Sequence, residues 1–267
     1  MKTGAIVQAR LSSERLPGKV LLPLSRKPVL WHVLKRLKSC RKLDCVILAT
    51  STEKSDRKLK KVADELGIPV FFGSLNDVLA RYYYAAKKYG LDNIVRVTAD
   101  CPVIDPGIVD EVVERFIKGG FDYYGLSGDF PDGLDVTVYS FKALEEAFKE
   151  TILPSEREHV AGAFIEKSKD RFKVGGYKKF RNKVNYRWTI DEPEDYEFLK
   201  AIFDELCKED KKNFTYQDIF KLLRRKPELA KINMHIIRNE GYLQSLKTDK
   251  DFNKKNMQRN NINEKNS

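Results

Sequence analysis

Short apolar runs alternate with amphipathic stretches along the first half of the chain. Four runs have the length of strands: Ala5–Val7, Val46–Thr50, Pro69–Phe72 and Ile94–Thr98. The segments between them show the helical recurrence of apolar residues: Val29–Lys38, Asp56–Leu66 and Asp77–Lys88. Strands that alternate with helices of about 10–15 residues indicate βαβ units and a parallel sheet. The continuous apolar character of the strands is expected where helices cover both faces of the sheet.

The second half of the chain continues with both kinds of element. Helices are predicted over Pro106–Ile117, Phe141–Lys149, Ser155–Lys167, Pro193–Lys208 and Thr215–Arg224. Strands are predicted over Phe121–Tyr124, Leu134–Tyr139, Phe172–Tyr177 and Val184–Thr189. After Leu246 the sequence is rich in Lys and Asn and has almost no apolar residues, so it buries too little surface to offset its ordering entropy. We therefore expect one domain over residues 1–246 and a disordered tail over residues 247–267.

Composition narrows the class of protein. The 267 residues are 42% hydrophobic, which is enough for a substantial core. The formal net charge of +11 is spread along the chain among acidic residues, which is compatible with anionic substrates or with weak nucleic-acid binding. The four cysteines have neither zinc nor disulfide-framework spacing, so reduced thiols in a cytoplasmic protein are expected. A signal-peptide core and a membrane-spanning apolar run are both absent from the sequence, so no membrane association is expected.

The segment from Gln8 to Lys19 has the composition of an anion-binding loop. It follows the first predicted strand, where open α/β sheets bind ligands. Three cations lie among small residues that let backbone N–H groups approach a phosphate. The residues expected to contact the phosphates or to shape the loop are Gln8, Ala9, Arg10, Ser12, Arg15 and Lys19. A solvated basic turn is the alternative interpretation.

Two predicted strands are followed by aspartates. The strand Ile94–Thr98 leads into Asp100, and the strand Val184–Thr189 leads into Asp191. If the strands are parallel, Asp100 lies at the same sheet edge as the basic loop. A carboxylate beside a phosphate site is suited to hold Mg²⁺, which binds one or two carboxylates together with phosphates and water. The alternative is helix capping, which fits Asp105 better than Asp100 and the acids after Asp191 better than Asp191 itself.

Two smaller clusters are candidates for substrate contacts. In the segment Pro154–His159, a capping box accounts for Ser155 and Glu158 and leaves three candidates: Glu156, Arg157 and His159. In the turn around Gly133, Asp135 alternates with apolar residues and is a candidate to reach the same site. The histidines outside these clusters are more readily explained as structural.

These motifs together resemble the sugar cytidylyltransferases, the group that includes CMP-sialic acid and CMP-KDO synthetases. The opening signature is in Ile6–Arg10 and Ser13–Lys19, and Asp100 and Asp191 resemble the two magnesium-binding aspartates of the family. The resemblance is closest to the branch of spore-coat polysaccharide biosynthesis protein F. The segments that carry it are Gly73–Tyr82, Gly133–Val138, Pro154–Val160 and Arg187–Asp191.

The resemblance implies a fold, an activity and roles for residues. The implied fold is a three-layer α/β/α sandwich of the nucleotide-diphospho-sugar transferase type, with a mainly parallel sheet and a small inserted β arm. The implied activity joins CTP to a sugar acid or sugar phosphate with Mg²⁺ and releases pyrophosphate, for cell-surface polysaccharide synthesis. Arg10, Lys19 and Asp100 would be catalytic. Base and ribose would contact Thr50, Ser51, Asn76, Asp77 and Arg81. The sugar-acid pocket of the sialate and KDO enzymes has no residue-by-residue match in this sequence, so the sugar contacts Asp135, Glu156, Arg157 and His159 are expected from the residue pattern alone.

Two other functions remain as alternatives at this stage. A glycosyltransferase of the same fold would consume a nucleotide-sugar, although the Asp-x-Asp triplet often expected there does not follow the middle strands. A basic nucleic-acid-binding protein would need a clustered basic face, and the acids interspersed along the chain argue against it. A monomer and a homodimer are both open.

Overall fold

The computed structural model describes residues 1–207, 214–238 and 240–265, with side chains through residue 254. Its centre is a seven-stranded sheet with the order β5-β4-β1-β6-β8-β7-β9. The strands are β1 (Thr3–Gln8), β4 (Cys45–Ser51), β5 (Val70–Gly73), β6 (Asn93–Thr98), β7 (Tyr123–Leu126), β8 (Thr137–Ser140) and β9 (Val174–Tyr177). β5, β4, β1 and β6 pair in parallel, β8 is antiparallel to β6 and β7, and β9 is parallel to β7. The predicted α/β class with a mainly parallel sheet is confirmed.

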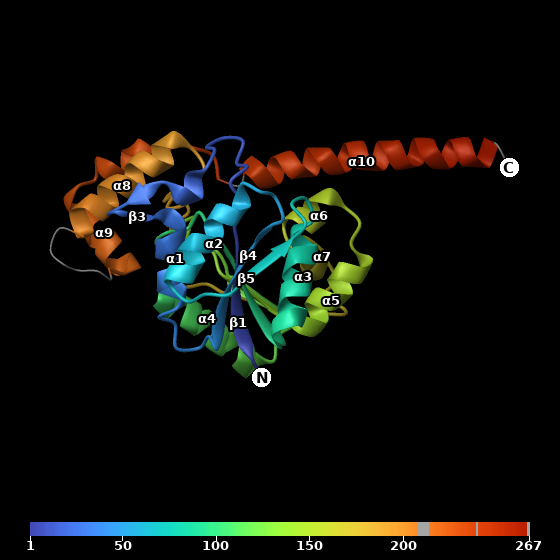
Figure 1. The fold of residues 1–267 in the computed structure, drawn as a ribbon, viewed down its shortest axis with the longest axis horizontal. Coiled ribbons are helices and arrows are strands. Elements are labelled where there is room, and N and C mark those ends of the chain that lie inside the picture. The colour runs from blue at the N-terminus through green and yellow to red at the C-terminus, as the bar shows by residue number, and fades with distance from the viewer. Residues whose placement is uncertain (208–213, 239, 266–267) are drawn as a thin grey trace.

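Helices cover both faces of the sheet and complete three layers (Figure 1). One face packs against α3 (Val78–Tyr89), α5 (Phe141–Glu150), α6 (Pro154–Glu158) and α7 (Gly162–Lys167). The other packs against α1 (Val29–Leu37), α2 (Leu59–Glu65), α4 (Pro106–Gly119), α8 (Pro193–Leu206) and α9 (Tyr216–Arg225). Three short 3₁₀ helices are η1 (Lys19–Leu21), η2 (Asp56–Lys58) and η3 (Leu229–Ile232). A small antiparallel ribbon of β2 (Pro23–Leu24) and β3 (Lys27–Pro28) is inserted between β1 and β4.

The strand sequences divide the core into two parts. Successive side chains of a strand point to opposite faces of a sheet. In β1, Ala5 and Val7 therefore enter the core beneath α1 and α4, whereas Ile6 enters the core beneath α3 and α5. All three side chains are fully buried. This arrangement explains why the parallel strands read as continuous apolar runs, and it fixes which residues reach each side of the strand ends.

Two predicted elements differ in the structure. The segment Val184–Thr189 is not a strand, because only Arg187 forms a β-bridge, to Asp132. The predicted helix Ser155–Lys167 is two helices, α6 and α7. Between them, Val160 and Ala161 have φ of 59° and 54°, outside the α-helical region, and both side chains are fully buried in the core. The free energy gained by burying Val160 and Ala161 therefore exceeds the cost of interrupting the helix between α6 and α7.

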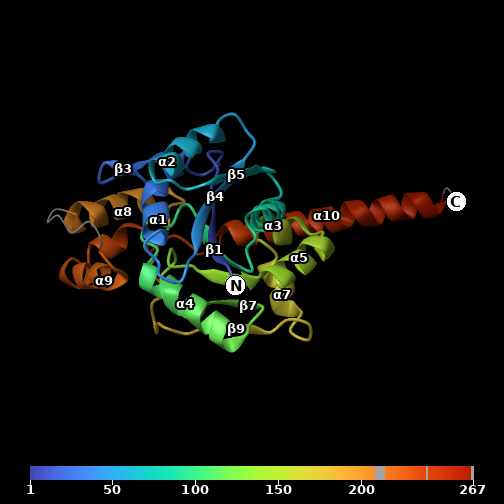
Figure 2. The same cartoon turned by 60° about the horizontal axis from the view of Figure 1, so that its bottom comes forward.

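In the C-terminal segment, residues 240–265 form one helix, α10 (Glu240–Lys265), where the sequence pattern predicted no element. Its first turns lie against α6, and the rest extends away from the body (Figures 1 and 2). The contact is polar: the buried carboxylate of Asp249 accepts hydrogen bonds from the backbone N–H and the hydroxyl of Ser155, at 2.9 and 2.5 Å. Because this contact is polar, the hydrophobic pattern of the sequence could not predict the helix or its docking on α6.

The turn at Gly133 leads to our first prediction. Gly133 has φ of 97°, and a Cβ there would lie 2.4 Å from the carbonyl oxygen of Trp188. We expect Gly133→Ala to cost at least about 2–3 kcal/mol in the free energy of unfolding, measured with urea, from backbone strain and overlap together. Gly120→Ala is the matched control, because Gly120 also has positive φ but faces open space, and should cost about 1–2 kcal/mol. Equal losses would contradict the close approach.

Candidate active site

The basic loop and the two aspartates meet at the carboxyl ends of the parallel strands. Lys19, at the start of η1, places its Nζ 2.6 Å from Asp100, which follows β6. The same Nζ lies 2.6 Å from Asp191, which precedes α8. The three side chains are 12%, 20% and 23% exposed, so they remain reachable from solvent. One ammonium thus occupies the point at which two carboxylates from distant parts of the chain converge.

The close approach of Lys19 to the two carboxylates shifts the pKa of Asp100 and of Lys19 itself. Burial would raise the pKa of Asp100, but the charge of Lys19 and hydrogen bonds from Lys19 and Thr98 lower it to about 2. Burial would likewise lower the pKa of Lys19, but the two carboxylates raise it above its ordinary value. Asp100 is therefore ionised and Lys19 protonated at neutral pH.

Asp191 is held by two arginines. Arg187 Nη2 lies 3.1 Å from Asp191, and the other nitrogens of Arg187 bind Asp132 at 3.1 Å and the fully buried Asp195 at 2.8 Å. From the basic loop, Arg15 Nη2 lies 3.2 Å from Asp191. Asp195 also accepts the backbone N–H of Asp191 and closes the capping box that begins α8. Asp191 is thus positioned from both sides, while Asp195 serves the helix start, as the sequence suggested.

A buried aspartate anchors the basic loop to the sheet. Asp56 in η2 is 1% exposed and accepts the backbone N–H of Leu11 at 2.8 Å. Its other oxygen accepts the hydroxyl of Ser51, at the end of β4, at 2.5 Å. The Ser51 hydroxyl, predicted to contact the nucleotide, therefore donates within the protein.

Three predicted nucleotide contacts present buried polar atoms that have no partner in the described part of the chain. They are Gln8 Oε1 at the end of β1, Thr50 Oγ1 in β4, and Nε and Nη1 of Arg81 in α3. Thr50 is fully buried and Arg81 is 1% exposed. Because buried polar groups are normally hydrogen-bonded, unpaired donors and acceptors gathered at strand ends indicate a site for a polar ligand.

Two other residues that were predicted to contact the substrates, Asp77 and Arg157, form an ion pair with each other. Asp77 caps α3 by accepting the N–H of Ala80, and its second oxygen accepts Nε and Nη2 of Arg157 at 2.9 and 2.7 Å. Arg157 also donates to the carbonyl oxygens of Phe148 and Thr151. The pair therefore joins α3 to α6.

The remaining predicted sugar contacts lie around α6 and the Gly133 turn. His159 Nε2 lies 3.1 Å from Ser245 Oγ of α10, and burial lowers the pKa of His159 to about 4. Burial raises the pKa of Glu156. Asp135 accepts the N–H of Gly133 and lies 3.7 Å from Arg238.

The remaining loop and nucleotide residues differ in exposure. Arg10 is 44% exposed and lies 3.9 Å from Glu158 of α6, so its guanidinium can turn toward a ligand at little cost. Ser12 and Asn76 are exposed. Ala9 is buried, and its N–H donates to the carbonyl oxygen of Ala49, so it shapes the loop.

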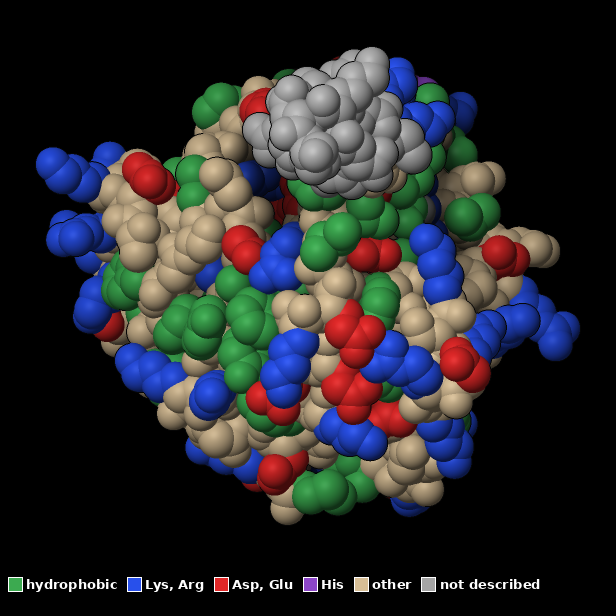
Figure 3. Space-filling view, turned by 90° about the vertical axis from the view of Figure 1, so that its right-hand side faces the viewer, with side chains coloured by type: hydrophobic (Ala, Val, Ile, Leu, Met, Phe, Trp, Pro, Cys, Tyr) green, Lys and Arg blue, Asp and Glu red, His purple; other side chains and the backbone are tan. Residues whose placement is uncertain are grey.

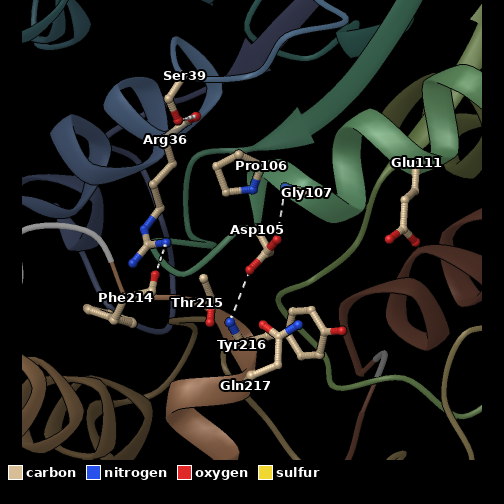
Figure 4. Close-up of a pocket in the computed structure, with 10 residues that line it drawn as sticks. All are labelled: Arg36, Ser39, Asp105, Pro106, Gly107, Glu111, Phe214, Thr215, Tyr216 and Gln217. Atoms are coloured by element: carbon tan, nitrogen blue, oxygen red, sulfur yellow. Dashed lines mark hydrogen bonds between the residues drawn. The ribbon is translucent and has the colours of Figure 1, made fainter.

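A cavity of about 320 Å³ lies elsewhere, between α1, the start of α4 and the start of α9 (Figure 4). Asp105 there caps α4 through the N–H groups of Gly107 and Ile108 and also accepts the N–H of Tyr216. Arg36 donates to the carbonyl oxygen of Phe214. The polar groups of this cavity are used to join helices, and none of the strand-end residues lines it.

Sequence reasoning missed several residues at the site. Arg96 and Arg187 each interrupt an apolar run with a charge, which is a signal that the sequence offered. Asp56 and Asp249 offered none, because each lies in a polar segment and its partners come from distant parts of the chain.

A family model described as cytidylyltransferase matches residues 4–224. The chain belongs to the cytidylyltransferase family. The resemblance inferred from the sequence motifs is thus confirmed, and the chain is a cytidylyltransferase enzyme.

Relatives and a solved structure agree with this family. The uncharacterized protein MJ1063 of Methanocaldococcus jannaschii is 36% identical, over 91% of this chain and 98% of its own. The spore coat polysaccharide biosynthesis protein SpsF of Bacillus subtilis is 30% identical, over 84% and 95%. A 3-deoxy-manno-octulosonate cytidylyltransferase of Hydrogenovibrio crunogenus is 29% identical, over 55% and 56%. The structure of a cytidylyltransferase from Leptospira borgpetersenii is 36% identical, with a TM-score of 0.80 over 86% and 97%.

Proposed function

We propose that this cytidylyltransferase makes a CMP-sugar acid from CTP and a free sugar acid, and releases pyrophosphate. The observation that carries the proposal is the convergence of Asp100 and Asp191 on Lys19 Nζ, at 2.6 Å each, beside the basic loop. A fixed cation and two carboxylates at strand ends suit a triphosphate, which needs both positive charge and a metal ion. The names of the SpsF and 3-deoxy-manno-octulosonate relatives support a role in cell-surface polysaccharide synthesis. Such a role would place the enzyme in the cytoplasm.

The donor set fits a divalent metal ion such as Mg²⁺. Asp100 and Asp191 share the Lys19 ammonium at 2.6 Å each, so they lie close enough to share one cation, and a bound ion would require Lys19 to move toward the phosphates. Mg²⁺ binds one or two carboxylates with phosphates and water. Within the described residues, no group of three or more His, Cys, Asp and Glu side chains could hold a metal alone. Asp100 and Asp191 would therefore share the ion with the triphosphate. The bound metal would neutralise charge on the phosphate oxygens.

The protein residues then have separate tasks in the transfer. The sugar hydroxyl attacks the α-phosphorus in line and gives its proton to solvent water. The new O–P bond forms as the bond from the α-phosphorus to the pyrophosphate oxygen breaks, and pyrophosphate leaves. Lys19 and Arg10 would stabilise the charge that develops on the phosphates. Asp56 would keep the loop that carries both cations in place.

The nucleotide half of the site would bind the base and ribose. Arg81 presents two N–H donors from α3, and Thr50 presents a hydroxyl from the opposite face of the sheet, which it shares with Val46 and Leu48; none of these groups has a partner among the described residues. Cytosine carries two acceptors, its carbonyl oxygen and a ring nitrogen, that such donors can satisfy. This complementarity supports CTP.

A screen of substrates tests the proposed function. Pyrophosphate release would be measured with Mg²⁺ and each of the four nucleoside triphosphates, against KDO, nonulosonic acids and sugar phosphates. We expect release with CTP and a sugar acid. A glycosyltransferase would instead transfer sugar from a nucleotide-sugar without pyrophosphate, and that result would contradict the proposal.

The surface argues against the nucleic-acid alternative. The face over α5 to α7 shows basic and acidic side chains interspersed (Figure 3). Several of them pair with each other, as Arg171 does with Glu146 and Glu150.

No helix in the described part of the chain is long and apolar enough to cross a membrane.

A further inference from the structure

Arg96, in the middle of the sheet, has no hydrogen-bond or ion-pair partner for its guanidinium among the residues that the structure describes. It lies in β6 between Val95 and Val97, which enter the core beneath α4, so its side chain points to the opposite face. Its Nε is sealed from solvent and makes no hydrogen bond. No hydrogen bond or ion pair reaches its guanidinium from the residues that the structure describes. The residue as a whole is only partly buried, so part of it stays accessible.

The surroundings of Arg96 favour its charged form, because the neighbouring phenols and Asp135 raise its pKa in spite of burial, but they include no anion paired with it among the described residues. The side chains of Tyr82, Tyr123 and Tyr139 lie around it, and burial raises the pKa of all three phenols, so they are neutral at physiological pH. The charge of Arg96 adds to burial in lowering the pKa of His159, so this imidazole is neutral as well. Asp135 attracts Arg96 at longer range, but it is 44% exposed and its nearest cation is Arg238.

A guanidinium in this position keeps its charge and can bind a ligand that supplies the counter-charge. Burying a charged group without hydrogen bonds is unfavourable, and a partner that binds both ends of the guanidinium fork restores them. Arg96 lies four residues before Asp100, so at most roughly 13 Å of strand separates their Cα atoms. An arginine side chain and one sugar ring span that length. Arg96 is thus placed to hold the far end of an acceptor whose hydroxyl meets the α-phosphate near Asp100 and Lys19.

We propose that Arg96 binds the carboxylate of the acceptor sugar and thereby selects sugar acids. The proposal rests on the proposed function. A single carboxylate matches the single unpaired charge, whereas a phosphate carries nearly two charges and would need a second cation. His159 would border the same position from α6, where Ser245 and the ring of Tyr242 in α10 fix its imidazole. Arg96 is then a binding residue of the acceptor half of the site, separate from Thr50 and Arg81 in the nucleotide half.

The test measures binding without turnover. Calorimetry would follow KDO, N-acetylneuraminate and glucose 1-phosphate binding to the full chain, in the presence of CTP without metal. We expect Arg96→Gln to weaken binding of the sugar acids about 10–100-fold and to leave the dissociation constant of CTP within twofold. Arg81→Gln should do the reverse and weaken CTP alone. Arg115→Gln is the matched control, because Arg115 stacks on Tyr177 from α4, and it should match the unaltered protein.

Each outcome decides the inference. Equal binding of the sugar acids by Arg96→Gln, or no binding by the unaltered protein, would overturn it, and so would a loss confined to glucose 1-phosphate. If Arg96→Gln does not fold, Arg96→Lys keeps the charge but loses the fork, and the same sugar acids should then bind about tenfold more weakly. Pyrophosphate release by the unaltered protein is scored separately. Failure of release with all acceptors counts against the proposed function, whereas unchanged binding by the variant counts against Arg96.

Discussion

Lys19→Ala should lower turnover about 10²–10³-fold, equivalent to roughly 2.7–4 kcal/mol of transition-state stabilisation. The reason is that Lys19 is a preorganised donor at the position where the triphosphate would develop charge, and no other described residue binds both Asp100 and Asp191. Asp100→Asn should have an effect of similar size, because it removes one of the two carboxylates proposed to share the metal. The measurement is the rate of pyrophosphate release at saturating CTP and acceptor.

Stability is the control for this prediction. The three side chains of the cluster are partly exposed at a strand end, so the melting temperature should barely change in either variant. Lys35→Ala, at an exposed position of α1, should retain both rate and melting temperature. Near-normal pyrophosphate release by Lys19→Ala or Asp100→Asn would contradict the assigned roles.

Arg187→Met should cost about 3–5 kcal/mol in the free energy of unfolding. Arg187 is 5% exposed and binds three carboxylates, so its loss leaves Asp195 buried without its cation and leaves Asp132 beside Asp191 without compensation. Burial and the neighbouring Asp135 raise the pKa of Asp132 to about 7 even with Arg187 present, which shows how finely this charge is balanced. Urea unfolding measures the loss.

The matched control lies on the surface. Arg171 also binds two carboxylates, those of Glu146 and Glu150, but it is 39% exposed and solvent screens its charge. Arg171→Met should therefore leave the unfolding midpoint nearly unchanged. If the two variants lose the same stability, the burial of Arg187 is not what makes it important.

The sequence predicted best the strands whose side chains are covered on both faces of the sheet. β1, β4, β5 and β6 are apolar on both faces because helices cover both, so composition alone located them to within two residues. Val184–Thr189 is not a strand because Val184 is exposed and Trp188 is buried through tertiary contacts. The backbone N–H of Trp188 donates to the carbonyl oxygen of Asp132, and no strand ladder forms. The split between α6 and α7 failed because helical periodicity continues across Val160, while packing fixes its positive φ.

The site was predicted where chemistry depends on residues near a strand end. The loop from Gln8 to Lys19 and Asp100 have that property, because they follow β1 and β6. Asp191 joins them at Lys19 although the segment before it is not a strand. The support around them could not be predicted, because each contact joins segments far apart in the chain. Asp249 is 94 residues from Ser155, and Asp56 is 45 residues from Leu11. Local patterns do not encode such pairs.

The α6 region shows how structure changes the meaning of a motif. Arg157 and His159 resembled sugar contacts, yet Arg157 holds Asp77 and His159 contacts Ser245. These contacts position α6, and the role of both residues as sugar contacts stays a prediction. The guanidinium that has no partner among the described residues belongs to Arg96.

The most direct test of the proposed reaction follows the phosphorus atoms of CTP. CTP labelled with ³²P at the α-position, and separately at the γ-position, would be incubated with Mg²⁺, the enzyme and the acceptor that the screen identifies. We predict that the α-label appears in a CMP-sugar and the γ-label in pyrophosphate, in equal amounts. Appearance of the γ-label in orthophosphate or on the sugar, or an α-label that stays in free nucleotide, would contradict nucleotidyl transfer.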